Sequence, residues 1–327
     1  MAVLRILLII ALFGFTPIVG QPGCAGAADT TPGGVVVDQM GRRITVARPF
    51  ERIISLYGAH TENLFALGLD EAVIGVSRSE TYPPQALERP VFSYREDPER
   101  LLAARPDLVL TRPMIDGGYP HFVARLEQMG ITVASLQPAG PQQIFAYWRN
   151  LGRLTGREEA AGRQVRRFES ALAVFRELTR AVQPKKRVYF EAIHRRMKTF
   201  APQSTAMFVL EAAGGINAAP DARAVRGTNI AAYGKERILA RGRGIEVYLA
   251  QVGTMNQVTR DMIVKEPGFQ TIAAVQAGEV HLIDETIVSR PTLRLLQGIH
   301  EIGMVLYPEI FRDPGPAILA QAGLAGP

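Results

Sequence analysis

Two segments of this chain of 327 residues carry almost the same pattern, and this repeat limits the folds available to it. The segments are ERLLAARPDLVL, which starts at Glu99, and ERILARGRGIEVYL, which starts at Glu236. Each has an acid, an arginine, aliphatic residues and a basic loop, and then an acid before a short apolar run. A helix that leads into a buried strand fits both segments. We therefore predict two versions of one α/β unit.

Other landmarks repeat at nearly the same separation. Arg52 and Arg187, which each open a predicted strand, are 135 positions apart. Asp107 and Glu246, which head two later strands, are 139 positions apart, close to the 137 positions between the two segments. A period this long indicates duplicated lobes and not a solenoid of short repeats.

Short β-branched runs alternate with helical patterns along both halves. In chain order the runs cover 52–57, 72–76, 107–111 and 131–136, and then 187–193, 214–219, 246–251 and 279–284. Nearly continuous apolar strands that alternate with helices are typical of parallel sheets covered on both faces. Between the halves, apolar residues at spacings of three and four over 158–182 predict one long helix. The sequence thus predicts two α/β lobes joined by this helix.

The first residues have the composition of an export signal. Arg5 supplies a positive charge, an apolar run follows from Ile6 to Phe15, and Ala25-Gly26-Ala27 is a small-x-small cleavage site. This predicts a signal peptide over 1–27 and a periplasmic or otherwise extracytoplasmic protein. No later apolar run is long enough to span a bilayer, so we expect no transmembrane segment in the mature form.

Cys24 is the only cysteine, and it leaves a lipid anchor open as the alternative to a soluble protein. Gln21, however, stands where lipoprotein signals usually carry leucine. If cleavage follows Ala27, the mature chain has no cysteine, which excludes disulfides and thiol catalysis.

The remaining boundaries follow from composition and from the strand series. A flexible leader covers 28–34, an N-terminal lobe 35–155, the linking helix 156–184, a C-terminal lobe 185–313 and a C-terminal tail 314–327.

The sequence contains none of the motifs that would indicate catalysis. It has no G-x-S-x-G elbow and no phosphate-binding loop, and HEIGM at His300 has Met304 where a zinc protease needs its second histidine. The net charge of +6 is spread over 37 basic and 31 acidic residues, without a run that marks a nucleic-acid arm. We therefore predict a binding function, with no catalytic residues, no direct metal ligands and no nucleic-acid partner.

The stretch DQMGRRITVARPFERIISLYGAHTENLFALGLDEAVIGV resembles the opening of periplasmic substrate-binding proteins of ABC importers for iron chelates and cobalamin. DPERLLAARPDLVL, MFVLEAAGGIN and KERILA are further matches, and Arg290-Pro291 opens the closing helix. The similarity runs from about residue 35 to residue 311. Tyr57-Gly58 departs from the family, which often has proline after the first strand, and this leaves the ligand open.

The resemblance implies two Rossmann-like lobes with parallel sheets, joined by a single long backbone helix, and a ligand held in a cleft between the lobes. It also implies that Glu99 and Glu236 dock on the two subunits of an ABC importer permease. Taken alone, each glutamate is better explained by its place in the first turn of a helix, where the helix dipole favours an acid, and it is the pair that favours docking. We expect the protein to be a monomer.

Ligands of doubly wound sheets bind outside the carboxyl ends of the strands, so the residues after each strand are the candidates. In the first lobe these are Tyr57, His60, the run from Arg78 to Tyr82, Arg112 and Tyr119, with Tyr94 in an intervening loop. In the second lobe they are His194, Arg195, Arg196, the run from Gly253 to Asn256, Ser289 and Arg290. Arginine pairs well with carboxylates, which favours an anionic ferric siderophore, or haem through its propionates, over largely uncharged cobalamin. For each position, a solvated loop arginine or a tyrosine at the core edge is the alternative.

The predicted function is that of an exported binding protein that captures an iron complex (siderophore or haem) or a corrinoid and delivers it to an ABC importer. The metal chelate is cargo, and no cofactor is expected. An exported α/β enzyme that acts on a similar ligand, or a binding protein for an oxoanion, remains the alternative.

Overall fold

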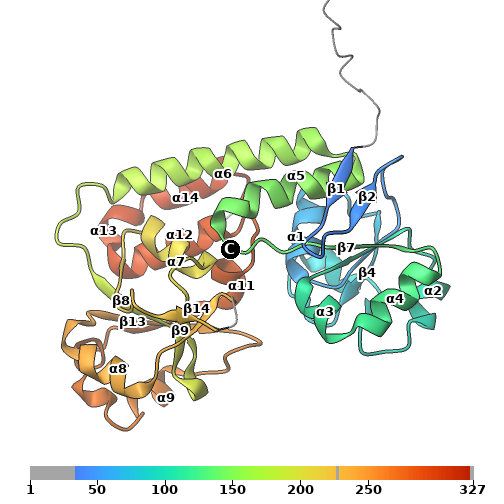
Figure 1. The fold of residues 1–327 in the computed structure, drawn as a ribbon. Coiled ribbons are helices and arrows are strands. Elements are labelled where there is room, and N and C mark those ends of the chain that lie inside the picture. Colours follow the sequence, from blue (N-terminus) through green and yellow to red (C-terminus); the bar gives the residue numbers. More distant parts are fainter. Residues whose placement is uncertain (1–33, 226–227, 325–327) are drawn as a thin grey trace, which may run out of the picture. The chain divides into compact units, whose positions relative to one another are not determined.

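The structure is a computed structural model that describes residues 34–225 and 228–324 (Figure 1). The predicted signal peptide, Cys24 and most of the predicted leader lie outside these residues. From Gly33 onward the chain is one compact unit, and each half of it has its own sheet. None of the helices in the described ranges has both the length and the apolar character needed to cross a bilayer.

The first lobe contains a five-stranded sheet in the order β5-β4-β3-β6-β7, in which every pair is parallel. Its strands are β3 (Ile53–Ser55), β4 (Val73–Ser77), β5 (Val91–Phe92), β6 (Leu108–Thr111) and β7 (Thr132–Ser135). Its helices are α1 (Gly58–Ala66), α2 (Glu99–Ala103), α3 (Pro113–Gly118), α4 (Pro120–Gln128) and α5 (Ile144–Thr155), and a hairpin of β1 (Val35–Val37) and β2 (Arg43–Thr45) precedes them. The four runs predicted for this half are strands β3, β4, β6 and β7.

The second lobe contains a seven-stranded sheet with the path β11-β12-β9-β8-β13-β14, and β10 pairs with β8. Its strands are β8 (Arg187–Ile193), β9 (Lys198–Phe200), β10 (Ile216–Asn217), β11 (Arg223–Ala224), β12 (Ile230–Ala232), β13 (Val247–Val252) and β14 (Val280–Asp284). Its helices are α7 (Thr205–Ala212), α8 (Lys235–Arg241), α9 (Arg260–Val264), α10 (Ala273–Gln276), α11 (Glu285–Ser289), α12 (Leu295–Leu306), α13 (Pro308–Phe311) and α14 (Pro314–Gln321).

This second sheet is mixed, which the sequence did not predict. The pairs among β10, β8, β13 and β14 are parallel, and they correspond to the four predicted runs of this half. Strands β9, β11 and β12 add antiparallel pairs beside β8. These strands have only two or three residues each, too few to show a periodic pattern in the sequence.

Alternate residues of the central strands face different cores. In β3, Ile53 belongs to a core that also contains residues of α5 and α6, whereas Ile54 packs with residues of α3 and α4. In β8, Val188 faces the same core as Ile53, and Tyr189 faces a third core. Because both faces of each sheet are covered, the strands read as continuous apolar runs.

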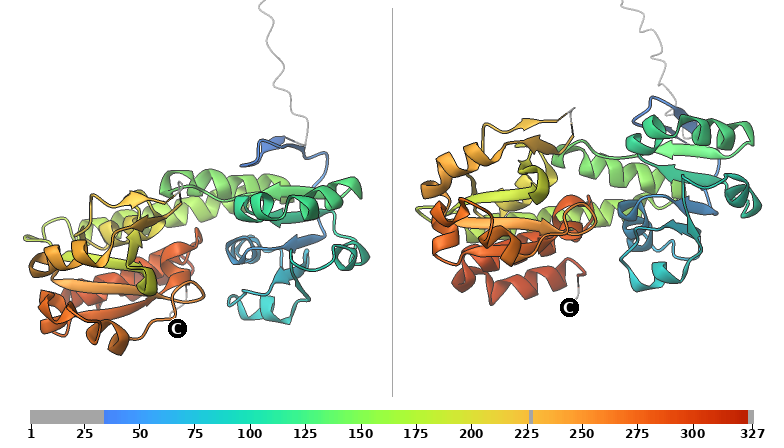
Figure 2. Two further views of the ribbon diagram at one scale, coloured as in Figure 1. Left: turned by 60° about the horizontal axis from the view of Figure 1, so that its bottom comes forward. Right: turned by 90° about the horizontal axis from the view of Figure 1, so that it is seen from below.

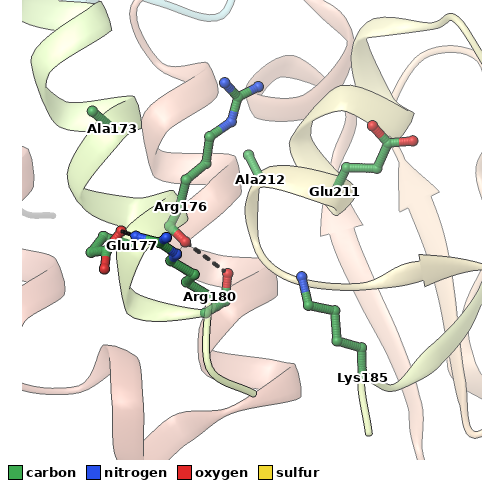
Figure 3. A pocket seen from close by; sticks show the side chains of 8 residues that line it. Ala173, Arg176, Glu177, Arg180, Lys185, Glu211 and Ala212 are labelled. Carbon is green, nitrogen blue, oxygen red and sulfur yellow. Dashed lines mark hydrogen bonds and ion pairs between the residues drawn. The ribbon is translucent and has the colours of Figure 1, made fainter. Parts of the chain in front are cut away.

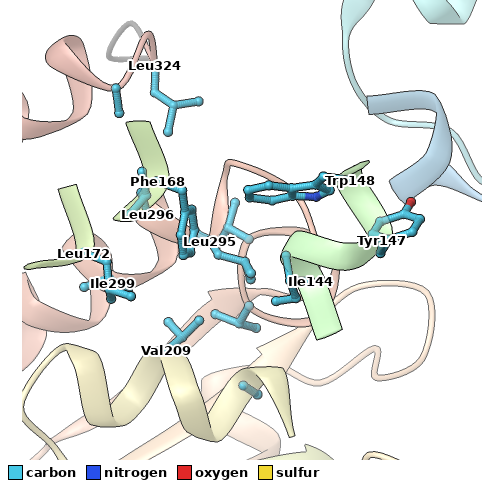
Figure 4. Close-up of a cluster of buried hydrophobic side chains, with 14 of the residues drawn as sticks. Ile144, Tyr147, Trp148, Phe168, Leu172, Val209, Leu295, Leu296, Ile299 and Leu324 are labelled. Atoms are coloured by element: carbon cyan, nitrogen blue, oxygen red, sulfur yellow. The ribbon is translucent and has the colours of Figure 1, made fainter. Parts of the chain in front are cut away.

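Helix α6 (Glu158–Leu178) is the predicted linking helix, although it ends a few residues before the predicted limit. It packs against α5 of the first lobe and against α7, α12 and α14 of the second (Figures 1 and 2). Its Phe168 lies in one buried core with Trp148 of α5 and Leu295 of α12 (Figure 4). Phe168 and Trp148 meet edge to face with their ring centroids 5.4 Å apart. One helix therefore belongs to the cores of both lobes.

The segment predicted as a C-terminal tail begins with helix α14. Ile318 and Leu319 of this helix are buried in the core that contains α6. Residues 314–321 are therefore part of the second lobe and not a tail, because their apolar side chains complete the cover of α6.

The predicted repeat is present in the hydrogen bonds at the amino ends of matching strands. The Asp107 carboxylate accepts the backbone N–H of Arg52 at 2.9 Å, and Arg52 Nε donates to the carbonyl two residues before that acid at 2.9 Å. In the second lobe, Glu246 accepts the backbone N–H of Arg187 at 2.9 Å, and Arg187 Nε donates to the carbonyl two residues before Glu246 at 3.2 Å. Both lobes therefore have the same pair of hydrogen bonds at the amino ends of these strands.

Candidate ligand-binding site

A cavity of about 420 Å³ opens at the carboxyl ends of strands from both sheets, and we call it the strand-end cavity. It is lined by Thr81, Val252, Gly253, Thr254, Leu282, Ile283, Asp284, Glu285, Thr286 and Arg290. Thr81 follows β4 of the first lobe, whereas the other lining residues belong to β13, β14, α11 and the segments that follow them. This is the position at which doubly wound sheets bind ligands.

Acids and hydroxyls, together with aliphatic side chains, make up most of the cavity wall. Asp284 caps α11 and accepts the backbone N–H of Thr286 at 2.7 Å and its hydroxyl at 2.8 Å. Glu285 accepts the backbone N–H of Met255 at 3.0 Å. The sequence predicted an arginine-rich cleft, but the described lining of this cavity contains a single arginine.

Arg290 is the only base among the described lining residues, and it pairs with an acid of the other lobe. Its Nη1 donates to Glu62 Oε1 at 2.8 Å, and its Nη2 donates to the Ser79 carbonyl at 3.1 Å. Arg294 also pairs with Glu62, whose side chain is 3% exposed. The Arg290 guanidinium thus joins the two lobes, and it shares the single negative charge of Glu62 with Arg294.

His60 lies in the core of the first lobe and not in the cavity. It is completely buried, with Nε2 at 2.8 Å from the Thr111 carbonyl and Nδ1 at 2.7 Å from the Tyr147 hydroxyl. The carbonyl can only accept, so Nε2 carries the proton and Nδ1 accepts from the tyrosine. Burial lowers the pKa of His60 to about 4, which keeps the imidazole neutral. The predicted ligand contact is therefore corrected to a structural role.

Tyr57 and Arg112 come together at the ends of β3 and β6. The Arg112 guanidinium lies over the Tyr57 ring, 4.7 Å from its centroid. Burial raises the pKa of the Tyr57 hydroxyl, while the positive charges of Arg112 and Arg290 act in the opposite direction. Both side chains are partly exposed, so this pair can meet a ligand.

The other candidates of the first lobe form two separate contacts. Tyr94 and Tyr119 pack together with their ring centroids 4.7 Å apart. Arg78 is mostly exposed and donates to Glu96 at 3.0 Å. Tyr94, Tyr119 and Arg78 are not among the described residues that line the cavity.

The candidates of the second lobe divide into buried and exposed residues. His194 and Asn256 are each 4% exposed, and the His194 backbone N–H donates to Asn256 Oδ1 at 2.9 Å. Asn256 Nδ2 donates to the Gln251 carbonyl at 2.9 Å, which fixes the turn after β13. Arg195 and Arg196 are exposed at the end of β8. His194 and Asn256 therefore support the cavity wall, and they do not line it.

The two glutamates of the repeated segments occupy matching exposed positions. Glu99 is in the first turn of α2 and Glu236 is in the first turn of α8, and both helices lead into a central strand. Glu99 Oε1 accepts from Arg125 at 3.2 Å, an ion pair between exposed side chains that contributes little to stability.

Several cavity residues were not identified from the sequence. Asp284 ends the strand predicted over 279–284, and Glu285 and Thr286 directly follow it, so the rule about strand ends pointed to them. Thr81 and Tyr82 lie within the predicted run from Arg78 to Tyr82. Tyr82 is 39% exposed, is not among the described lining residues, and has the Arg294 guanidinium 4.2 Å from its ring centroid.

A second cavity, of about 470 Å³, lies at the carboxyl end of α6 and is lined by Ala173, Arg176, Glu177, Thr179, Arg180, Lys185, Glu211 and Ala212 (Figure 3). Its charges are mixed, and Arg180 pairs with Glu177 at 3.4 Å. None of the described residues that line it follows the carboxyl end of a strand, so the strand-end cavity is the better candidate for ligand binding.

Comparison with known proteins gives consistent matches over most of the chain. The family model described as periplasmic binding protein matches residues 53–286. The vitamin B12-binding protein of Vibrio cholerae is 25% identical over 261 residues, which cover 79% of this chain and 90% of that protein. An ABC transporter substrate-binding lipoprotein of Bacillus subtilis is 24% identical over 281 residues, covering 84% and 86%. The apo structure of a periplasmic haem-binding protein from Roseiflexus has a TM-score of 0.68 and 25% identity, covering 80% of this chain and 99% of that one.

Proposed function

The chain belongs to the periplasmic binding protein family, and on that premise we propose that it captures a metal chelate outside the cytoplasm and delivers it to an ABC importer. The proposed ligand is an iron complex or a corrinoid, held at the strand-end cavity. The family is a class of binding proteins, which agrees with the absence of catalytic motifs from the sequence.

One observation carries this proposal: the cavity lies where the strand ends of both lobes converge. Thr81 is contributed by the first lobe, and Arg290 of the second is fixed by Glu62 of the first. A ligand in this cavity therefore contacts both lobes at once, while α6 in both cores favours a small hinge motion. Such a site suits capture and release of an intact ligand.

The charges of the wall favour a weakly charged chelate over a strongly anionic one. Asp284 and Glu285 line the cavity, and Arg290, the one base among the described lining residues, is already paired with Glu62. A carboxylate-rich ligand brought against these acids would be repelled. We therefore place a corrinoid first, and an anionic iron complex second, since Arg112, Arg195 and Arg196 are available only outside the lining.

Tyr82 is the proposed stacking contact. Tyr82 is exposed and follows Thr81 in the chain, and its ring packs on the Arg294 guanidinium, which Glu62 in turn holds at 3.0 Å. An aromatic ring fixed in this way offers a flat apolar face with little entropy to lose.

Titration of purified mature protein with cyanocobalamin, haemin and a ferric hydroxamate tests the proposed function. We expect saturable, reversible binding of one of these, with the ligand recovered unchanged. Tyr82→Ala should weaken binding at least tenfold and Tyr82→Phe should preserve it, while Tyr94→Ala serves as a matched control away from the cavity. Conversion of the ligand would support the enzyme alternative, and binding of oxoanions alone would overturn the proposal.

Docking on the permease is proposed to use Glu99 and Glu236, one per lobe. We expect the double variant Glu99→Arg/Glu236→Arg to lose uptake in cells and to keep its ligand affinity. Glu169→Arg, which reverses an exposed glutamate on α6, is the control and should transport normally. Uptake that persists in the double variant would remove the docking assignment and leave the ligand site intact.

A further inference from the structure

The cavity segment after β13 is fastened to a buried carboxylate in the second lobe. Asn256 ends this segment, accepts the backbone N–H of His194 and donates to Gln251. Its Nδ2 also lies 3.4 Å from Glu191 Oε1. The backbone N–H of Gly253, which lines the cavity, donates to the Asn256 carbonyl at 3.1 Å. The position of this wall therefore depends on Asn256 and its partners.

Glu191 is the centre of these partners. Its side chain has no exposed surface, and Oε2 accepts from His194 Nδ1 at 2.9 Å and from the Tyr248 hydroxyl at 2.5 Å. A carboxylate buried this deeply needs compensation by a cation or by several donors. His194, whose Nδ1 lies 2.9 Å from this carboxylate, can supply such a cation when its imidazole is protonated.

A second acid faces the other nitrogen of the same imidazole. His194 Nε2 lies 3.7 Å from Glu266 Oε2, and Glu266 Oε1 accepts from Lys235 Nζ at 2.6 Å. Lys235 is the first residue of α8, directly before Glu236. The contacts thus run without a break from the cavity wall to the helix that carries the proposed docking glutamate.

We infer that His194 is a positioning residue, which as imidazolium bridges Glu191 and Glu266 and so holds the cavity wall at 252–256 in register with the start of α8. The consequence for ligand delivery rests on the proposed function, whereas the bridge itself does not. Deprotonation removes the charge that both acids share. The wall then loses its fixed anchor and α8 loses its connection to it.

The charged, polar and aromatic groups around His194 come from several elements of the second lobe. They are Glu191 of β8, Tyr248 of β13 through Glu191, Asn256 of the following segment, Glu266 after α9, Lys235 of α8 and the Phe269 ring. The hydrogen bond to Glu191 raises the pKa of His194, while burial and Lys235 act against this and Glu266 adds to it.

Two readouts across pH test the bridge. Hydrogen-exchange protection of the Gly253 amide, corrected for the intrinsic exchange rate at each pH, reports on the wall without any ligand. The affinity for cyanocobalamin reports on function. NMR of the His194 ring in wild-type protein gives its titration midpoint, against which both are compared.

We expect protection and affinity to fall together, by about tenfold, as the pH rises through the His194 midpoint. His194→Gln should have, at every pH, the low protection and low affinity that the wild type has only at high pH. His121→Gln, which changes an exposed histidine of the first lobe, should behave as wild type. Protection that stays constant while His194 titrates in the wild type would overturn the inference, whether or not the variants fold. If cyanocobalamin does not bind but protection follows His194, the bridge stands and the proposed ligand fails.

Discussion

The two lobes are alike at the amino ends of their strands and different at the carboxyl ends. At the amino ends, Asp107 and Glu246 make the same bonds to Arg52 and Arg187. At the carboxyl ends, each lobe has a buried histidine close after its first central strand, but the two have opposite surroundings. His60 contacts a backbone carbonyl and a tyrosine hydroxyl, whereas His194 lies between two carboxylates.

This difference shows which part of a duplicated fold is free to change. The amino-end bonds join a strand to the helix–strand turn beside it, so their loss would affect the fold of either lobe. The carboxyl ends carry the ligand in such sheets, and their side chains can diverge as long as every buried polar group keeps a partner. The neutral histidine satisfies this condition with hydrogen bonds, and the charged one satisfies it with ion pairs.

The largest effect is expected where the carboxyl ends of the lobes meet, at Glu62. Glu62→Gln removes the charge that balances Arg290 and Arg294, and both guanidinium groups stay buried. We expect a loss of about 3–5 kcal/mol in the free energy of unfolding, measured with urea.

Glu96 provides the matched control, because it also pairs with two arginines, Arg78 at 3.0 Å and Arg100 at 3.1 Å, but at the surface. Glu96→Gln should cost less than about 1 kcal/mol. If Glu62→Gln and Glu96→Gln lowered the free energy of unfolding equally, burial would not explain the contribution of the inter-lobe ion pairs to stability.

The next effect separates the two histidines by the sign of their pH dependence. The pKa of His60 is lowered from 6.5 to about 4, so the unfolded chain takes up a proton between these values and the native state does not. Its contribution is fully present above pH 6.5 and is lost as the pH falls, by about 3 kcal/mol at pH 4. His60→Gln should flatten this part of the profile in urea unfolding measured from pH 4 to 7.

His194 should act in the opposite direction. Its pKa is raised by the hydrogen bond to Glu191, so its contribution is fully present below the unfolded pKa of 6.5 and is lost as the pH rises through the folded value. His194→Gln should remove stability at pH 6 and have a smaller effect at high pH. A loss that is the same at both pH values would show that the imidazole is neutral and that the lobes do not differ in this way.

Much of the fold followed from the sequence because its signals are local. The eight predicted runs are strands, the linking helix begins where the periodic pattern begins, and the repeat appears as shared bonds at Arg52 and Arg187. The short strands β9, β11 and β12 were not predicted, since they are defined by pairing across the chain.

The site was harder to predict, because the role of a side chain depends on partners far away in the sequence. Arg290 looked like an anion contact, but its partner Glu62 stands 228 positions earlier. His60 looked like a ligand contact, and only the fold brings Tyr147 to it. Asp284 ended a predicted strand, and a rule that looks at strand ends would have found it, whereas residue type did not.

The smallest effect is expected at the shared amino-end bonds, and it tests the likeness of the lobes directly. Asp107 accepts two backbone N–H groups, from Glu51 and Arg52, whereas Glu246 accepts that of Arg187. At about 1 kcal/mol for each hydrogen bond, Asp107→Ala should cost about 2 kcal/mol and Glu246→Ala about 1 kcal/mol in the free energy of unfolding.

The two acids have no partner in common, so the double variant should lose the sum of the single losses to within about 0.5 kcal/mol. Urea unfolding of the three variants measures this, and Asp107→Asn, which keeps one acceptor oxygen, should fall between Asp107→Ala and wild type. A large loss at one acid with none at the other would mean that the matching bonds are a coincidence of geometry. Losses of stability in proportion to the number of hydrogen bonds, two at Asp107 and one at Glu246, would show that these bonds stabilise both lobes in the same way. The carboxyl ends of the strands, where the ligand is proposed to bind, are then the part that is free to change.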